Sequence, residues 1–319
     1  MKKWFAGLAV LLILLVTCLY IFIPGKLAVS RIIAINATKN GALRCLSDKA
    51  NWEKWWPATK DSTLPKGLAT DQDIFIFNGS TYRITQRLFR GFDLLIQSGD
   101  NKIESRITMQ PISVDSVSVE WQCMLMPGLN PVKRLLDYRR AVEISNNLAD
   151  LLERLRGFLE KKENIYSISI EQTQVKDTLL VTAKNISQKS SSMPLVYGLI
   201  KNLRDYISSQ GAEETNYPML NIMALDSTHF ETLVAIPVNK ELKGNGTISP
   251  KRMVPGNILV TEVRGGNYSI NHAMGLLENY IDDYQKSRIA IPFESMVTDR
   301  SSETDTSQWV TKIYYPIIR

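Results

Sequence analysis

The run Thr311–Pro316 near the C-terminus carries the residues best placed for binding chemistry. Side chains alternate between the two faces of a strand, so Lys312 and Tyr314 share one face and Ile313 lies on the other. If that face is enclosed, the ammonium of Lys312 needs an acidic partner or an anionic ligand, because a buried, unpaired charge is costly. Glu294 is the first candidate partner. The alternative is that Lys312 points into solvent from an edge strand, as most lysines do.

Catalysis and metal binding find little support in the spacing of reactive residues. No serine or cysteine nucleophile stands in a recognisable pattern with His229 or His272, and no glycine-rich phosphate loop is present. Cys18, Cys45 and Cys123 lack metal-ligand spacing; a Cys45–Cys123 disulfide is one interpretation, and free buried thiols are the simpler one. We therefore predict no catalytic residues, no metal and no cofactor.

The composition argues against one class of partner. The 319 residues are enough for two domains of ordinary size. The formal net charge is +6, but the 38 basic residues are scattered among 32 acidic ones rather than gathered in a patch. A scattered charge of this kind serves solubility, with at most a preference for anionic surfaces. No nucleic-acid partner is predicted.

The chain begins with an apolar segment. Trp4–Ile23 contains no charged residue, and as a helix rising about 1.5 Å per residue it would cover a hydrocarbon core of ~30 Å. A secretory signal peptide would have a shorter apolar region and a small-residue cleavage site, which does not follow here. Leu15–Cys18 is only a weak match to a lipoprotein cleavage box. The two leading lysines favour an N-terminus inside. These features predict a single-pass membrane anchor, with the membrane as a partner and the remaining domains on the extracytoplasmic side.

The next segment, residues 26–163, has the pattern of one strand, short helices, five strands and a long helix. Leu27–Asn36 alternates like a strand, and Thr38 is placed to cap a following helix. Apolar residues at three- to four-residue steps predict one long helix over Pro131–Lys162. Turn dipeptides separate five predicted strands: Asp73–Phe77, Thr81–Phe89, Phe92–Ser98, Lys102–Gln110 and Ser116–Met124.

With Asn51–Pro57 following its first strand and helix, this segment resembles the START-like (SRPBCC, polyketide cyclase-like) superfamily. The resemblance implies a helix-grip fold, in which an antiparallel sheet curls around the last helix and leaves an apolar cavity. The four tryptophans of the segment could line that cavity, although a packed core is the simpler interpretation: Trp52, Trp55, Trp56 and Trp121.

The C-terminal half reads as one unit written twice. Leu180 and Leu259 occupy matching positions in two similar strands, and they are separated by the same number of residues as Pro237 and Pro316. A helical pattern follows each of the two strands. A twofold repeat is too short for a solenoid. It predicts a pseudosymmetric α+β domain with a cleft where the halves meet.

This half resembles the effector-binding domains of the gyrase-inhibitor-like family, found alone and attached to AraC-type and MerR-type regulators. The matching residues are Pro255-Gly256, Arg264–Tyr268, Pro292–Glu294, Phe230-Glu231, Ala235–Pro237 and Ile313–Ile317. The resemblance implies two βαββ units about a pseudo-dyad, with a small-molecule pocket between the helices and the sheet. Members that bind cationic drugs have a pocket glutamate where this chain has Lys312. That departure implies a pocket with an ammonium in place of a carboxylate, so the cation-binding role is not carried over.

Taken together, we predict an α+β protein with three parts: an N-terminal transmembrane helix over residues 1–25, a START-like helix-grip domain over 26–163, and a gyrase-inhibitor-like domain of βαββ repeats over 164–319. The predicted function is membrane-anchored binding of a small, partly apolar molecule in the C-terminal cleft, with the START-like cavity as a second candidate site. The alternatives are an enzyme acting on a small electrophile, since some relatives hydrolyse such molecules, and a protein-interaction module. The candidate ligand-binding residues are Lys312, Tyr314, Glu294, Tyr268, Met223 and Trp309.

Overall fold

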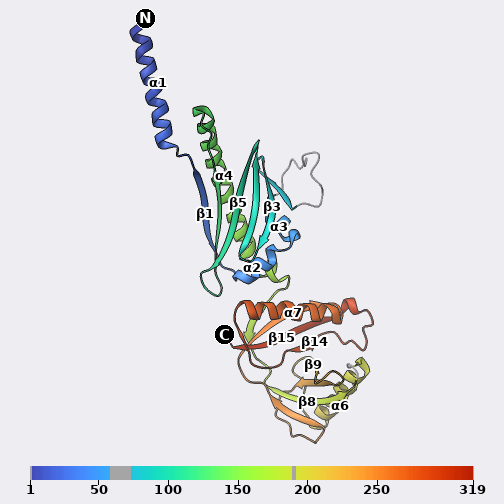
Figure 1. Ribbon diagram of the computed structural model, residues 1–319. Helices are drawn as coiled ribbons and strands as arrows, with labels where there is room; N and C mark the ends of the chain where they lie inside the picture. The colour runs from blue at the N-terminus through green and yellow to red at the C-terminus, as the bar shows by residue number, and fades with distance from the viewer. Residues whose placement is uncertain (1, 58–72, 189–191, 319) are drawn as a thin grey trace. The chain divides into compact units, whose positions relative to one another are not determined.

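Two separate antiparallel sheets and the helices beside them form the described part of the chain (Figure 1). The computed structural model describes residues 2–57, 73–188 and 192–318. These fall into an N-terminal unit, Met1–Ile165, and a C-terminal unit, Tyr166–Arg319. Each unit has its own sheet, so the α+β class expected from the sequence holds for both.

The first helix, α1 (Lys2–Phe22), corrects the prediction of a membrane anchor. Within the described residues, no helix combines the length and the apolar character needed to cross a membrane. The predicted transmembrane helix and the extracytoplasmic placement are therefore wrong, and the membrane as a partner is not supported.

The N-terminal unit is built on a six-stranded sheet in the order β1-β6-β5-β4-β3-β2. Its strands are β1 (Leu27–Ile35), β2 (Ile74–Phe77), β3 (Ser80–Leu88), β4 (Gly91–Ser98), β5 (Asn101–Pro111) and β6 (Val117–Leu125). Two short helices, α2 (Lys39–Leu46) and α3 (Lys49–Trp55), follow β1. The long helix α4 (Pro131–Leu159) comes after β6, and α5 (Lys162–Tyr166) ends the unit.

Local signals in the sequence explain these boundaries. The hydroxyl of Thr38 caps α2 by accepting from the Gly41 N–H at 3.2 Å. Asn78 and Gly79 have φ of +46° and +71°, the pair of positive angles that a type I′ hairpin turn between β2 and β3 requires. At Gly91 a Cβ atom would lie 1.9 Å from a backbone oxygen of β5, so only glycine fits there.

Helix α4 supplies the apolar surface that covers one face of this sheet. Asn130 caps its first turn, and Leu148, Leu152 and Leu155 are buried. Two apolar residues of the periodic pattern, Leu135 and Val142, are exposed, because the first half of the helix buries Arg134, Asp137 and Ala141 instead. The apolar periodicity thus identifies the helix but not its buried face in the first half.

The C-terminal unit is built on a nine-stranded sheet in the order β11-β8-β10-β9-β14-β15-β12-β7, with β13 paired to β15. Its strands are β7 (Glu171–Gln174), β8 (Leu179–Ser187), β9 (Met219–Ala224), β10 (Phe230–Pro237), β11 (Ile248–Arg252), β12 (Asn257–Arg264), β13 (Ser287–Arg288), β14 (Phe293–Met296) and β15 (Val310–Ile318). Two helices of equal length accompany them, α6 (Met193–Ser209) and α7 (Asn267–Asp283), and a 3-10 turn, η1 (Thr306–Gln308), precedes β15.

The topology of this sheet is a twofold repeat. The order β8-α6-β9-β10 recurs as β12-α7-β14-β15, and the two copies meet where β9 pairs with β14. The preceding strands are exchanged between the copies, since β7 pairs with β12 and β11 pairs with β8.

The register of the repeat differs by one residue from the one expected. Pro237 lies opposite Leu180, and its counterpart Pro316 lies opposite Ile258, not Leu259. Leu180 and Leu259 look alike in sequence but point to opposite faces. A one-residue slip in a strand exchanges its two faces.

Helices cover only one of the two faces of the nine-stranded sheet. On one, the helix-covered face, Val181, Val234 and Ile236 pack with buried residues of α6, and the Tyr315 hydroxyl lies beside Arg288, whose side chain pairs with Asp282 of α7. The other, the open face, carries the alternate residues of the same strands, and neither helix packs on it.

Candidate functional site

Two adjoining hollows on the open face form a groove, and they differ in character. The first, the apolar hollow, has a volume of about 400 Å³ and is lined mostly by hydrocarbon side chains. These include Leu180, Met219, Leu233, Ala235, Met253, Val254, Ile289, Ile291 and Phe293. The second, the polar hollow, has a volume of about 250 Å³. Its polar lining includes Glu171, Lys176, Asp177, Asn216, Ser295, Lys312 and Tyr314.

The two hollows occupy equivalent places in the two halves of the repeat. The apolar hollow lies over β8, β9, β10 and the segment that begins with β11, whereas the polar hollow lies over β12, β14, β15 and the segment that begins with β7. Four residues line both: Val175, Met219, Met253 and Phe293. These shared residues make the hollows one continuous groove, which we call the open-face groove.

Lys312 and Tyr314 lie together in the polar hollow, on neighbouring positions of one strand face. The ring of Tyr314 stacks on Phe293 of β14 with centroids 5.1 Å apart and planes 10° from parallel. Lys312 lies opposite Ser295 on one side and Glu262 on the other. In the described part of the chain, no carboxylate lies within ion-pair distance of Lys312. It is a partly buried cation that forms no ion pair with any described residue.

The hydroxyl of Tyr314 lies in an environment that keeps it protonated. Partial burial raises its pKa, and the negative charge of Asp177 raises it further. Asp177 itself accepts a hydrogen bond from the Asn216 side chain at 2.8 Å. At neutral pH, Tyr314 is therefore a neutral phenol that can donate a hydrogen bond, and it is a poor nucleophile.

Glu294 lies on the other face of the sheet and does not meet Lys312. Because it stands opposite Ile313, its side chain points to the helix-covered face, where it pairs with Arg300 at 3.1 Å. The Arg300 side chain is only 1% exposed. It also donates to the Thr311 hydroxyl at 2.8 Å, and its guanidinium lies 4.8 Å from the ring centre of Trp309. The acid expected to neutralise the groove lysine instead holds a buried arginine.

Burial controls the protonation of Glu294. Removal from water raises its pKa, and the attraction of Arg300 only partly opposes that effect. Glu294 and Trp309 are thus brought together, but as part of a packed ionic cluster on the helix-covered face rather than in the open-face groove.

The two remaining candidates lie outside both hollows. Tyr268, in the first turn of α7, is 84% exposed and stacks on His272 with planes 3° from parallel. Met223 is 40% exposed near the end of β9, two residues beyond Asn221, which does line the apolar hollow. Of the six residues expected to bind a ligand, only Lys312 and Tyr314 lie in the groove.

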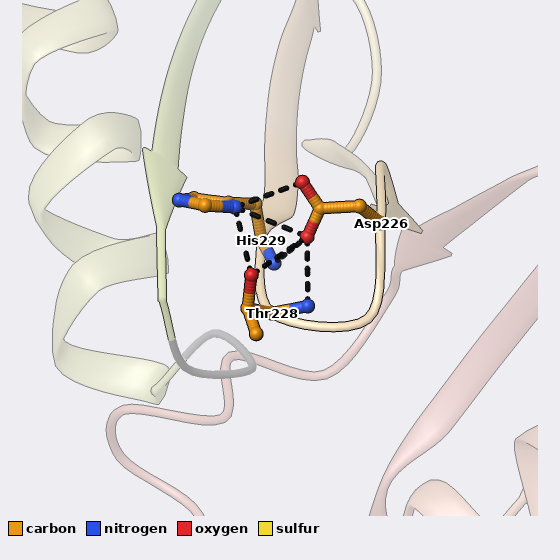
Figure 2. Close-up of polar contacts among 3 residues, drawn as sticks. All are labelled: Asp226, Thr228 and His229. Atoms are coloured by element: carbon orange, nitrogen blue, oxygen red, sulfur yellow. Dashed lines mark hydrogen bonds and ion pairs between the residues drawn. The ribbon is translucent and has the colours of Figure 1, made fainter.

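His229 lies in the exposed turn between β9 and β10, together with Asp226 and Thr228 (Figure 2). Asp226 accepts from the backbone N–H groups of Thr228 and His229, each at 2.7 Å, and these bonds lower its pKa to about 2. The carboxylate and the Thr228 hydroxyl both approach the same ring nitrogen, Nδ1 of His229. A proton relay needs them on opposite nitrogens. The cluster is a turn motif and not a catalytic triad.

In the N-terminal unit the tryptophans form a packed core. Trp52 and Trp121 are fully buried, and the ring of Trp52 lies 5.2 Å from Trp55 and 6.3 Å from Trp56. The large hollow of this unit, about 610 Å³, lies over the outward side chains of the sheet, including Arg106, and none of the four tryptophans lines it.

The cysteines are free thiols. Cys45 and Cys123 are both buried, and burial raises the pKa of each to about 11, so neither is a reactive thiolate at neutral pH. In the described ranges no group of three metal-ligating side chains occurs.

Several groove residues are not singled out by their sequence. Met219, Met253 and Val175 are ordinary apolar residues, and Asp177 lies in what looks like a turn between two strands. The available signal was alternation: along β8, β9 and β10, the residues on the open face are flanked by residues of the helix-covered core. That signal becomes usable only when the pairing register is known.

Comparison with known proteins gives structural likeness but no family. No family model and no curated protein matches the chain. An EcmrR–DNA complex solved by cryo-EM is similar at 18% identity with a TM-score of 0.43, covering 59% of this chain and 70% of that one. The structure of SAV2435 bound to tetraphenylphosphonium is similar at 13% sequence identity with a TM-score of 0.34, covering 47% of this chain and 94% of that one. A START superfamily protein from Mycobacterium smegmatis is similar at 18% sequence identity with a TM-score of 0.30, covering 42% of this chain and 97% of that one. All three TM-scores lie below 0.5, so no conclusion about the fold or function of this chain is drawn from these similarities.

Proposed function

We propose that the C-terminal unit binds a small, partly apolar molecule in the open-face groove. The observation that carries this proposal is the apolar hollow of about 400 Å³ that opens directly into a polar one. Ligand sites of proteins typically have volumes of about 300–1,000 Å³, a mostly apolar lining and a few placed polar groups. The groove has all three features on a sheet face that the helices of the unit leave uncovered.

The groove also accounts for residues that the fold alone does not require. Met219 and Met253 belong to the boundary between the two hollows, and methionine side chains adapt to ligands of different shape. The stacked pair Phe293 and Tyr314 presents aromatic surface beside them. Ala235, a small residue on the floor, leaves room where a larger side chain would close the hollow.

An enzyme using Glu294 and Tyr314 together is not supported by this geometry. The two side chains lie on opposite faces of the sheet, so they cannot act on one substrate. Tyr314 has a raised pKa, which opposes its use as a base or nucleophile at neutral pH. Binding is therefore the function that the arrangement supports best.

The proposal is tested by filling the apolar hollow. We expect the full chain to bind Nile red, a neutral apolar dye whose fluorescence rises on transfer from water. Ala235→Trp should weaken that binding about tenfold or more, because the indole occupies the space of the ligand. Met253→Gln, a milder change at the boundary, should weaken it less.

Ser208→Trp, on the exposed end of α6, is the matched control for an added indole and should leave binding unchanged. Circular dichroism of each variant checks that it folds. If the dye binds equally well to wild type, Ala235→Trp and Met253→Gln, the groove is not the binding site.

A further inference from the structure

We propose that the open-face groove selects an amphiphilic organic anion, whose acidic group contacts Lys312 and Tyr314 in the polar hollow while its apolar body lies in the apolar hollow. This inference rests on the proposed function and adds the chemical class of the ligand. It follows from the charges around the groove, from the one partly buried cation among its described lining residues, and from the continuity of the two hollows.

The charges that line the polar hollow are not equivalent. Glu171 and Lys176 are exposed, so water screens them. Asp177 already accepts from Asn216 at 2.8 Å. Asn216 is neutral, so Asp177 keeps its negative charge. Lys312 is partly buried and, in the described residues, forms no ion pair or hydrogen bond. Glu262 stands opposite Lys312 on the same strand face, but it is exposed, and the two form no ion pair within the described residues. Lys312 is therefore the partly buried cation of the hollow, and an anion complements it.

Charged groups near the apolar hollow do not compete for the same ligand group. Arg252 lies at its rim and is already paired with Glu241 at 2.9 Å. Lys251 lies at the same rim and is exposed. An acidic group placed at that end would remain in water. At the other end of the groove, the ammonium of Lys312 is partly buried and has no ion-pair partner among the described residues.

Tyr314 supplies a second donor beside the ammonium. Its hydroxyl stays protonated at neutral pH because burial and the charge of Asp177 both raise its pKa. Lys312 and Tyr314 are two residues apart on one strand face, so one acidic group can reach both. The stacked ring of Phe293, which also lines the apolar hollow, gives the apolar body a continuous path away from the acidic group.

A ligand group with one negative charge suits the polar hollow better than a group with two. The polar hollow contains two acidic and two basic side chains, and Asp177 repels additional negative charge beside Tyr314. A carboxylate is therefore favoured over a phosphate monoester. A cationic amphiphile is disfavoured because its charged group would lie against Lys312.

The experiment compares three ligands that share one apolar chain and differ in the head group: decanoate, 1-decanol and decyltrimethylammonium. Each is titrated below its micelle concentration into the full chain, and displacement of Nile red is measured. We expect decanoate to bind about tenfold or more tightly than decanol, and decyltrimethylammonium to bind most weakly. In Lys312→Met the advantage of decanoate over decanol should vanish. In Lys312→Glu the order of the two charged ligands should reverse.

Lys201→Met, on α6 with its side chain 74% exposed, is the matched control for loss of one lysine and should keep the wild-type preference. If the three ligands compete equally well, or if Lys312→Met keeps the preference for decanoate, the anion proposal is wrong while ligand binding stands. If the dye and all three ligands fail to bind wild type, the proposed function itself fails.

Discussion

The two faces of the nine-stranded sheet treat charge in opposite ways. On the helix-covered face, Arg300 is 1% exposed and is held by Glu294, Thr311 and Trp309. On the open face, Lys312 is partly buried and, within the described chain, has no such partner. Lys312 belongs to β15 and Arg300 contacts the same strand through Thr311, but only Arg300 is part of the core.

The difference separates a structural charge from a binding charge. A guanidinium cannot be deprotonated in a protein, so the fold loses stability when a buried arginine has no carboxylate to balance its charge. A lysine in an open hollow can remain hydrated until a ligand arrives. Removing the first cation should therefore affect folding, whereas removing the second should affect binding.

The largest expected effect comes from Arg300→Met. This change leaves Glu294 and the Thr311 hydroxyl without their partner in a buried site, and breaking a buried pair in this way costs about 3 kcal/mol. Urea unfolding of the C-terminal unit measures the loss. Arg204→Met, which breaks the exposed pair with Glu214, is the control and should cost less than about 1 kcal/mol. Equal losses in the two variants would contradict the distinction between the faces.

The pH dependence of the same variant should follow the titration of Glu294. Burial raises the pKa of Glu294 in the folded state, so its contribution to stability is present below the ordinary value and is lost as the pH rises through the raised one. Arg300 opposes that shift, and without it the pKa rises further. The stability gap between wild type and Arg300→Met should thus be smaller at pH 4, where Glu294 is protonated in both proteins, than at pH 7. A gap that does not change with pH would show that Glu294 does not titrate with the pair.

The helices and strands of both units can be predicted from local sequence signals. The face of the sheet on which a given strand residue lies cannot. Thr38, Asn78 and Gly91 mark helix and turn boundaries because capping and positive φ depend on neighbours in the chain. The expected α1 anchor came from apolar composition alone. That prediction is wrong, because no helix in the described chain is both long enough and apolar enough to cross a membrane.

The site was only half predictable for the same reason. Alternation along one strand correctly groups Lys312 with Tyr314. The expected partner, Glu294, depends on the register between β14 and β15, which places it opposite Ile313 and so on the other face. Its real partner, Arg300, lies in the segment between those strands, where no periodic pattern exists. The expected pocket between helices and sheet was likewise displaced, because both hollows lie on the open face.

The smallest expected effect on folding, and the sharpest contrast with Arg300, comes from Lys312→Met. Because no described residue pairs with the ammonium, its removal leaves no orphaned partner, and methionine retains most of the apolar stem. The free energy of unfolding should change by no more than about 0.5 kcal/mol, which is typical of substitutions away from buried networks. The same urea titration used for Arg300→Met measures it. A loss near that of Arg300→Met would mean that Lys312 is a structural charge, and the separation of the two faces into a folding side and a binding side would no longer hold.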